Sequence, residues 1–184
     1  WAGKPWAEIV SEARQDLLKK ALQHSSQYLD TSEHHETSLS RIVLLGHQPE
    51  LFHPGVWFKN FFAHHLARQL SAVCINLLID NATLDSAAIQ VPAGNPGSPG
   101  VETVAFDRSV APVPFESRDI QDLETFHSFG DRTHKTISHW ITNPLVDQLW
   151  PLVIDGQRAT GNLGLALARG RHQLEQAAGI KNLD

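Results

Sequence analysis

Apolar residues at the start of the chain recur at helical spacing. Residues 6–29 hold most of them, and this period predicts an amphipathic helix or a pair of helices. Residues 30–40 are polar and turn-rich, which predicts a loop. Within that loop we expect His34 and His35 to be solvated instead of bound to a metal.

The pattern then changes to that of a strand, a helix and a second strand. Residues 41–46 are a continuous apolar run ended by glycine, as in a buried parallel strand. Residues 56–70 carry a broad apolar face and predict a helix of about four turns. Residues 72–80 are again apolar and β-branched. This order predicts a βαβ unit, and hence an α/β fold with a Rossmann-like, mostly parallel sheet and flanking helices.

The second half of the chain is expected to be extended first and helical afterwards. Residues 82–120 contain alternating segments and an Asn-Pro-Gly-Ser-Pro-Gly turn cluster, so we expect an antiparallel extension of the sheet. Asp119 is the expected N-cap of the first of the following helices. The predicted organisation is one α/β domain over residues 1–184, with a helical segment at 1–40, a βαβ core at 41–118 and a mainly helical part at 119–184.

Composition narrows the class of partner. Hydrophobic residues make up 41% and charged residues 19%, which is typical of a globular protein. The net charge of −5 and the lack of a basic stripe argue against nucleic acid. No apolar run approaches the roughly 20 residues of a membrane span. The single cysteine, Cys74, fits a reducing, cytoplasmic compartment. We expect a small-molecule partner and leave a homo-oligomer open.

The chain contains no methionine. A protein of this length normally has a few, so we expect an incomplete sequence. Either the chain is part of a longer protein, or methionines are missing from the printed sequence and some neighbours in the text are not neighbours in the chain.

The turn GHQPELFHPG, residues 46–55, is the strongest candidate for a binding site. It joins a predicted strand to a predicted helix and carries more polar side chains than a plain connection needs. Ligands of open α/β sheets bind beyond the carboxyl ends of the strands. Residues 80–83 leave the next strand at that end, so we expect the two loops to lie side by side. The helix after Gly55 should also point unpaired N–H groups at the same crevice.

Each polar residue of these loops has an expected role. His47 and His53 are the expected catalytic residues, since an unperturbed histidine transfers protons near neutral pH. The expected binding residues are Gly46, Gln48, Gly55, Lys59, Asn60, Asp80 and Asn81. A metal held by His47, His53 and Asp80 is the weaker alternative, because zinc, HExxH and Walker motifs are absent from the sequence. The cofactor is unknown, with a nucleotide as an open alternative.

Residues 41–92 resemble the core of the bacillithiol-synthesis cysteine ligase family. In that family a strand leads into a Gly-Gln-Gln-type loop, a Gly-Pro pair opens the helix, and a lysine follows. The residues that match this pattern are Gly46, Gln48, Gly55 and Lys59, with Asp80 and Asp85 for the acidic motif after the next strand. The chain differs at His47, at the inverted order Pro54-Gly55 and at Asn81. It is similar to an uncharacterised bacterial branch with GHQP and FHPG loops.

A second resemblance concerns His53-Pro54-Gly55-Val56, which is similar to the HxGH loop of nucleotidylyltransferases and pantothenate synthetase. Val56 stands where the second histidine of that loop would be. This resemblance implies nucleotide or phosphate binding more than complete adenylyl transfer, and both resemblances imply a Rossmann-like layer.

The leading functional hypothesis is a ligase-like enzyme that joins an amine or amino acid to a small sugar- or phosphate-bearing acceptor. The first alternative is a non-catalytic nucleotide- or metabolite-binding domain, or a degenerate nucleotidylyltransferase. The second is a scaffold whose loop only packs. Elsewhere, Arg169, Arg171 and His172 are expected on a solvated helix face.

Overall fold

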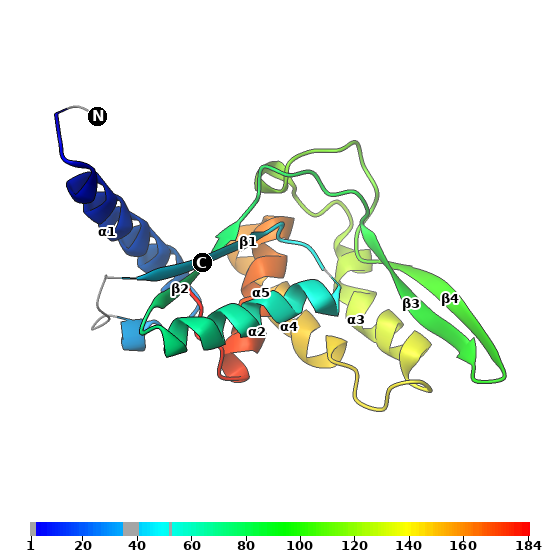
Figure 1. The fold of residues 1–184 in the computed structure, drawn as a ribbon. Helices are drawn as coiled ribbons and strands as arrows, with labels where there is room; N and C mark the ends of the chain where they lie inside the picture. The colour runs from blue at the N-terminus through cyan, green and yellow to red at the C-terminus, as the bar shows by residue number, and fades with distance from the viewer. Residues whose placement is uncertain (1–2, 35–40, 52) are drawn as a thin grey trace. The chain divides into compact units, whose positions relative to one another are not determined.

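The computed structural model describes residues 3–34, 41–51 and 53–184. It confirms the α/β class, since helices and strands are interspersed along the chain (Figure 1). The helices and strands are α1 (Trp6–Ser25), β1 (Ile42–His47), α2 (Pro54–Gln69), β2 (Val73–Leu78), β3 (Ala88–Asn95), β4 (Ser98–Ala105), α3 (Leu123–Ile137), α4 (Val146–Thr160) and α5 (Leu163–Ala177). Short 3₁₀ turns lie at Ser32–His34 and Phe115–Ser117. Residue His35 of the expected loop lies outside the described residues.

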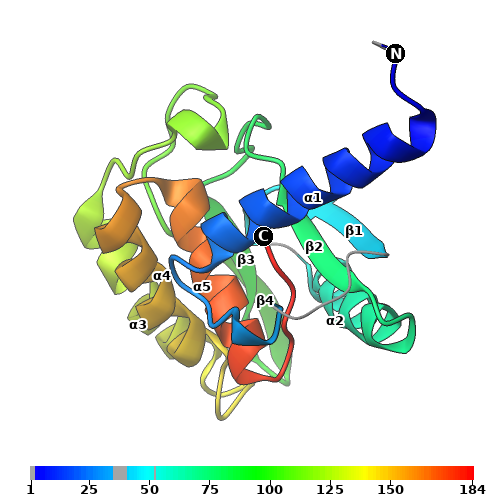
Figure 2. The same ribbon diagram turned by 90° about the vertical axis from the view of Figure 1, so that its left-hand side faces the viewer.

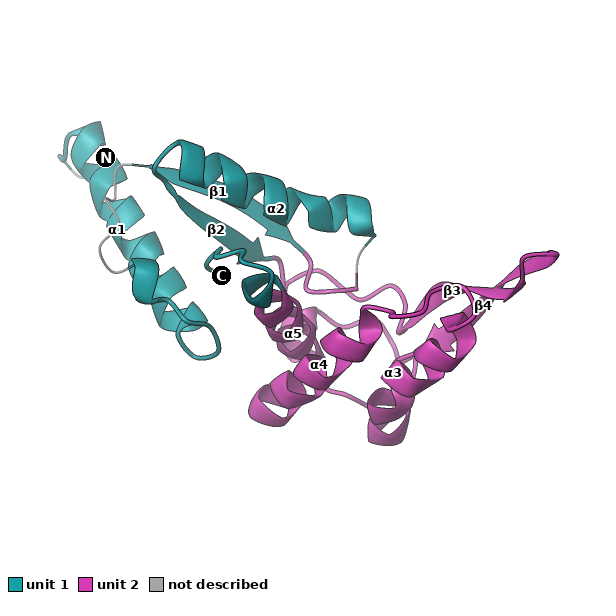
Figure 3. Cartoon of the chain, turned by 90° about the horizontal axis from the view of Figure 1, so that it is seen from below, with its two compact units in different colours: residues 1–47, 52–78, 175–184 teal, residues 48–51, 79–174 magenta. Residues whose placement is uncertain are grey.

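The chain forms two compact units, which we describe separately (Figure 3). Unit 1 consists of residues 1–47, 52–78 and 175–184, and unit 2 of residues 48–51 and 79–174. The predicted strand–helix–strand stretch, residues 41–80, therefore lies mostly in unit 1, while residues 79–174 build nearly all of unit 2.

Unit 1 is a two-stranded parallel sheet with a helix on each face. β1 pairs with β2 from Ile42↔Val73 to His47↔Leu78. The strands alternate as the two-residue period of a strand requires, because Ile75 packs with α1 and Cys74 with α2. Figures 1 and 2 show α2 running alongside the two strands. The predicted strand–helix–strand order is confirmed, but the described parallel sheet has two strands only.

The last residues of the chain complete unit 1. Leu183 pairs with Ile75 in a parallel bridge, and its backbone exchanges hydrogen bonds of 2.9 and 2.7 Å with Cys74 and Asn76. The amide of Asn76 also donates to the carboxylate of Asp184 at 3.1 Å. The segment therefore satisfies backbone groups at the edge of β2 that would otherwise be left unpaired.

Unit 2 is built around an aromatic core. Phe106, Phe126, Phe129 and Trp150 are all at most 2% exposed, and the indole N–H of Trp150 donates to the carbonyl of Phe126 at 2.7 Å. Gly130 permits this packing, since a Cβ there would lie 3.1 Å from the Trp150 Cβ. Rings of this size supply most of the apolar area that a core of this kind buries.

The expected antiparallel extension of the sheet is wrong in one respect. β3 and β4 pair antiparallel over their full length, but they form a separate two-stranded sheet. Their pairing is local, because the Asn95 side chain accepts the backbone N–H groups of Gly97 and Ser98 at 3.0 Å and closes the turn.

Two smaller expectations are also wrong. Asp122, not Asp119, caps α3 by accepting the Thr125 N–H at 3.0 Å. The buried Asp107 carboxylate accepts the backbone N–H groups of Gln121 and Asp122 and so fixes the chain just before the helix. The polar residues of α5 do not face solvent: Arg169 is 9%, Arg171 7% and His172 2% exposed, since this helix is buried on most of its surface. No helix among the described residues is long and apolar enough to span a membrane.

Candidate functional site

The carboxyl end of the parallel sheet carries the first two predicted site residues. His47 is the last residue of β1 and lies opposite Leu78, the last residue of β2. The segments that follow the two strands therefore leave the sheet at the same edge, as predicted. His47 is buried at 6% exposure, while Gly46 is exposed.

The N-terminus of α2 is closed by its own cap. The ring Nδ1 of His53 accepts the Gly55 N–H at 3.0 Å, and the His53 carbonyl accepts the N–H groups of Val56 at 2.8 Å and Trp57 at 3.1 Å. Pro54 has no N–H group to offer. The backbone donors of residues 54–57, which were expected to bind an anion, are therefore already used. In the neutral ring this bond leaves the proton on Nε2.

Asn60 has a structural position. It is fully buried, its side-chain amide donates to the Glu175 carboxylate at 2.8 Å, and its backbone carbonyl accepts from the Asn182 side chain at 3.0 Å. The Trp57 indole donates to the same carboxylate. These bonds hold the C-terminal segment of unit 1 and give Asn60 a role other than the predicted substrate contact. Lys59, one residue earlier, is exposed.

The middle of the first predicted loop, residues 48–51, belongs to the same unit as the second loop, whereas Gly46, His47, His53 and Gly55 belong to unit 1. Residues 48–51 cluster in unit 2 with residues 79–174, and Leu51 and Leu84 both pack against the aromatic core. Pro49 is buried, and a Cβ at Gly164 would lie 3.1 Å from its ring. The structure thus brings Gln48 into the same unit as Asp80 and Asn81.

The second loop is anchored by backbone bonds. The Asp80 carbonyl accepts the Glu116 N–H at 2.9 Å, and the Ala82 carbonyl accepts the Phe115 N–H at 3.0 Å. Gln48 and Asn81 are exposed, and Asp80 is half-buried. The backbone of this loop is therefore fixed while its polar side chains face outward.

Glu50 is a candidate that the sequence reasoning missed. Burial raises the pKa of the Glu50 carboxyl, and the nearby charge of Asp85 raises it further. Both residues belong to unit 2, and each comes from one of the two loops. Acids with a raised pKa are typical of proton-transfer sites. The signal was available, since Glu50 is the one acidic residue of the quoted turn.

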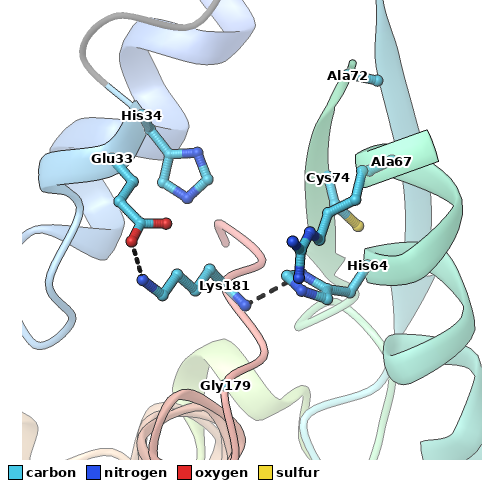
Figure 4. Close-up of a pocket in the computed structure, with 9 residues that line it drawn as sticks. Glu33, His34, His64, Ala67, Ala72, Cys74, Gly179 and Lys181 are labelled. Carbon is cyan, nitrogen blue, oxygen red and sulfur yellow. Dashed lines mark hydrogen bonds and ion pairs between the residues drawn. The ribbon is translucent and has the colours of Figure 1, made fainter. Parts of the chain in front are cut away.

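Unit 1 also contains a cavity of about 340 Å³, away from the predicted site (Figure 4). It lies near the start of β2, at Cys74, and near the last turns of α2, at His64 and Arg68. Its other walls come from Glu33 and His34, and from the C-terminal segment at Gly179 and Lys181. In Figure 4, Glu33 and His34 stand on one side of the cavity and His64 and Cys74 on the other.

An ion pair, a hydrogen bond and three shifted pKa values define the chemistry of this cavity. The Lys181 ammonium forms an ion pair with Glu33, and the hydrogen bond from Lys181 lowers the pKa of that carboxyl. The backbone N–H of Lys181 donates to His64 Nδ1 at 3.2 Å. Burial, then the charge of Arg68, lowers the pKa of His64.

Burial, then the charges of Glu175 and Asp184, raises the pKa of the Cys74 thiol to about 12, so it stays protonated.

Sequence reasoning missed this cavity because its residues come from three distant segments, one of which, residues 30–40, had been interpreted as a solvated loop. Among the described residues, no three His, Cys, Asp or Glu side chains converge as a metal site.

No protein-family model, curated protein or solved structure matches the chain.

Proposed function

We propose that the protein is a ligase- or transferase-like enzyme that joins an amine or amino acid to a small acceptor. The observation that carries the proposal is the meeting of residues 48–51 and 79–85 in unit 2, with Glu50 as an acid of raised pKa beside Asp85. Loops on a rigid scaffold commonly carry catalytic groups, and perturbed acids mark such sites.

Glu50 is the proposed proton acceptor. As the amine forms its bond to the acceptor, the acceptor's bond to its own leaving group breaks and the amine loses a proton. A carboxylate whose pKa is raised is a better base for that proton than an ordinary one. Gln48 and Asn81 are exposed and can orient a substrate, while the Asp80 carboxylate can pair with its amine. The predicted catalytic residues His47 and His53 belong to unit 1, so the proton transfer proposed for unit 2 uses neither of them.

The test starts with a thermal-shift screen of the full chain against amino acids, sugar phosphates and nucleotides, because ligand binding to the native state raises the melting temperature. Ligand pairs that stabilise the protein are then incubated together, and joined products are sought by mass spectrometry.

Glu50→Gln should reduce product formation by about 100-fold or more while ligand-induced stabilisation is kept. Glu102→Gln, at an exposed glutamate on β4 of the same unit, is the matched control and should keep full activity. Stabilisation without product from any pair would instead identify a non-catalytic binding domain. If no compound stabilises the protein, the scaffold alternative replaces the enzyme.

The finer parts of the proposal rest on the sequence. Two of these parts are a Rossmann-like layer and kinship with the bacillithiol-synthesis cysteine ligases. Both are supported by the parallel pairing of β1 with β2, which α2 connects along the chain. A cytoplasmic location is supported by the single cysteine. Nucleotide binding at the start of α2, as in nucleotidylyltransferases, is the weaker proposal, because His53 already occupies the donors that a phosphate would need.

A further inference from the structure

The cavity of unit 1 is independent of the proposed enzyme site, because every residue that lines it belongs to unit 1. Its volume of about 340 Å³ falls at the lower end of the range of small-molecule sites, which is about 300–1,000 Å³. A ligand of this site must therefore be small.

The charged side chains that line the cavity are unbalanced, although the carboxylates of Glu175 and Asp184 lie near enough to Cys74 to act on its thiol. Two permanent cations line the cavity, Arg68 and Lys181, against the single carboxylate of Glu33. The Glu33 carboxylate already forms an ion pair with the Lys181 ammonium. Within residues 3–34, 41–51 and 53–184, the Arg68 guanidinium has neither a hydrogen-bond acceptor nor an ion-pair partner. One positive charge thus remains over, on the side chain best suited to bidentate recognition of a carboxylate or phosphate.

The neutral groups of the cavity point to the same ligand chemistry. His64 uses Nδ1 to accept the Lys181 N–H, so the proton of its neutral ring is on Nε2. Cys74 keeps its proton and adds no negative charge. The wall formed by α2 and β2 therefore offers hydrogen-bond donors and one unpaired cation, with Ala67 and Ala72 as apolar surface beside them.

We propose that this cavity is a binding site for a small anion, the carboxylate or phosphate group of a metabolite, with Arg68 as its ion-pair partner and His64 as a hydrogen-bond donor. The charge of Lys181 is balanced by its ion pair with Glu33 on the opposite wall, so Arg68 supplies the positive charge for the ligand. Nothing in this proposal depends on the enzymatic role of unit 2.

The test titrates the full chain with inorganic phosphate, with citrate and with uncharged glycerol, and follows the ¹³C-methyl NMR signals of the alanines. The signals of Ala67 and Ala72 should move with phosphate, with citrate or with both, and not with glycerol. A response to one anion alone supports the site and identifies the group that it takes. Movement with neither anion at millimolar concentration, or an equal response to glycerol, overturns the proposal.

Two variants locate the charge. Arg68→Gln should weaken anion binding by about 10-fold or more, as loss of a charge-assisted bond predicts. Arg14→Gln makes the same charge change at an exposed position on α1 and should leave binding unchanged. Equal affinity in the two variants overturns the assignment to this cavity. Glu50→Gln should also bind the anion normally, so failure of the enzyme proposal and failure of this one can be told apart.

Discussion

Polar side chains gather at both ends of the β1–α2–β2 layer in unit 1, but the two ends use them differently. At the carboxyl end, His53 closes the start of α2 and Asn60 holds the Glu175 carboxylate. At the other end, the described residues leave Arg68 without a partner beside a cavity. A dense run of polar residues can therefore serve the fold itself. A hydrogen-bond donor that has no acceptor in the folded protein is better evidence of a ligand.

The largest effect is expected where a predicted site residue is buried. Asn60→Ala removes a donor from the Glu175 carboxylate, which is 2% exposed, and should lower the free energy of unfolding by about 3 kcal/mol. Asn81→Ala, at an exposed asparagine that was predicted for the same site, should change it by less than about 0.5 kcal/mol. Urea unfolding measures both. Equal losses in the two variants would remove the structural role that we give to Asn60.

A smaller effect is expected at the helix cap. His53→Ala should cost about 1 kcal/mol, the usual value of a lost N-cap side chain. His53→Asp should restore most of it, because aspartate caps well and interacts favourably with the helix dipole. If the alanine variant is as stable as the wild type in urea, the His53 cap does not stabilise α2. The backbone donors at the carboxyl end of the layer would then be as available to a ligand as Arg68 is at the other end.

The smallest effect concerns pH at the cavity end. Burial, together with the charge of Arg68, lowers the pKa of His64 below its usual 6.5, so the unfolded chain binds more protons than the folded one between the lowered pKa and pH 6.5. This penalty is absent above pH 6.5 and grows as the pH falls through that window. Wild-type protein should therefore lose more stability between pH 7.5 and 5.5 than His64→Gln does.

The control for this prediction is His139→Gln, at an exposed histidine of unit 2. It should follow the wild-type pH dependence of unfolding by urea. A flat wild-type profile, or a profile that His64→Gln leaves unaltered, would contradict the position of His64 beside Arg68.

Most of the local structure followed from hydrophobic periodicity. The strand at 41–46, the helix at 56–70 and the strand at 72–80 correspond to β1, α2 and β2 with small shifts at the ends. Hydrophobic periodicity is a local property of the sequence, so it predicts individual helices and strands well. It carries no information on which elements share a core, and therefore neither the two units nor the separate sheet of β3 and β4 could be read from it.

The candidate site was predictable only in part. The meeting of residues 48–51 with the second loop followed from the rule that parallel strands end at a common edge. The use of each side chain did not follow, because His53 and Asn60 make bonds that depend on their orientation in the folded chain. The cavity was hidden for another reason: Glu33, His64 and Lys181 are separated by long stretches of sequence and meet only after folding.

The pairing of Leu183 with β2 also has a consequence for the order of events in synthesis. Unit 1 takes residues from both extremes of the sequence, whereas 96 consecutive residues, 79–174, make up nearly all of unit 2. The ribosome therefore releases nearly all of unit 2 before it releases Leu183, which pairs with β2 in unit 1. The backbone groups at this edge of β2 therefore have no Leu183 to pair with until unit 2 has been synthesised, and contacts between segments so far apart in sequence slow folding.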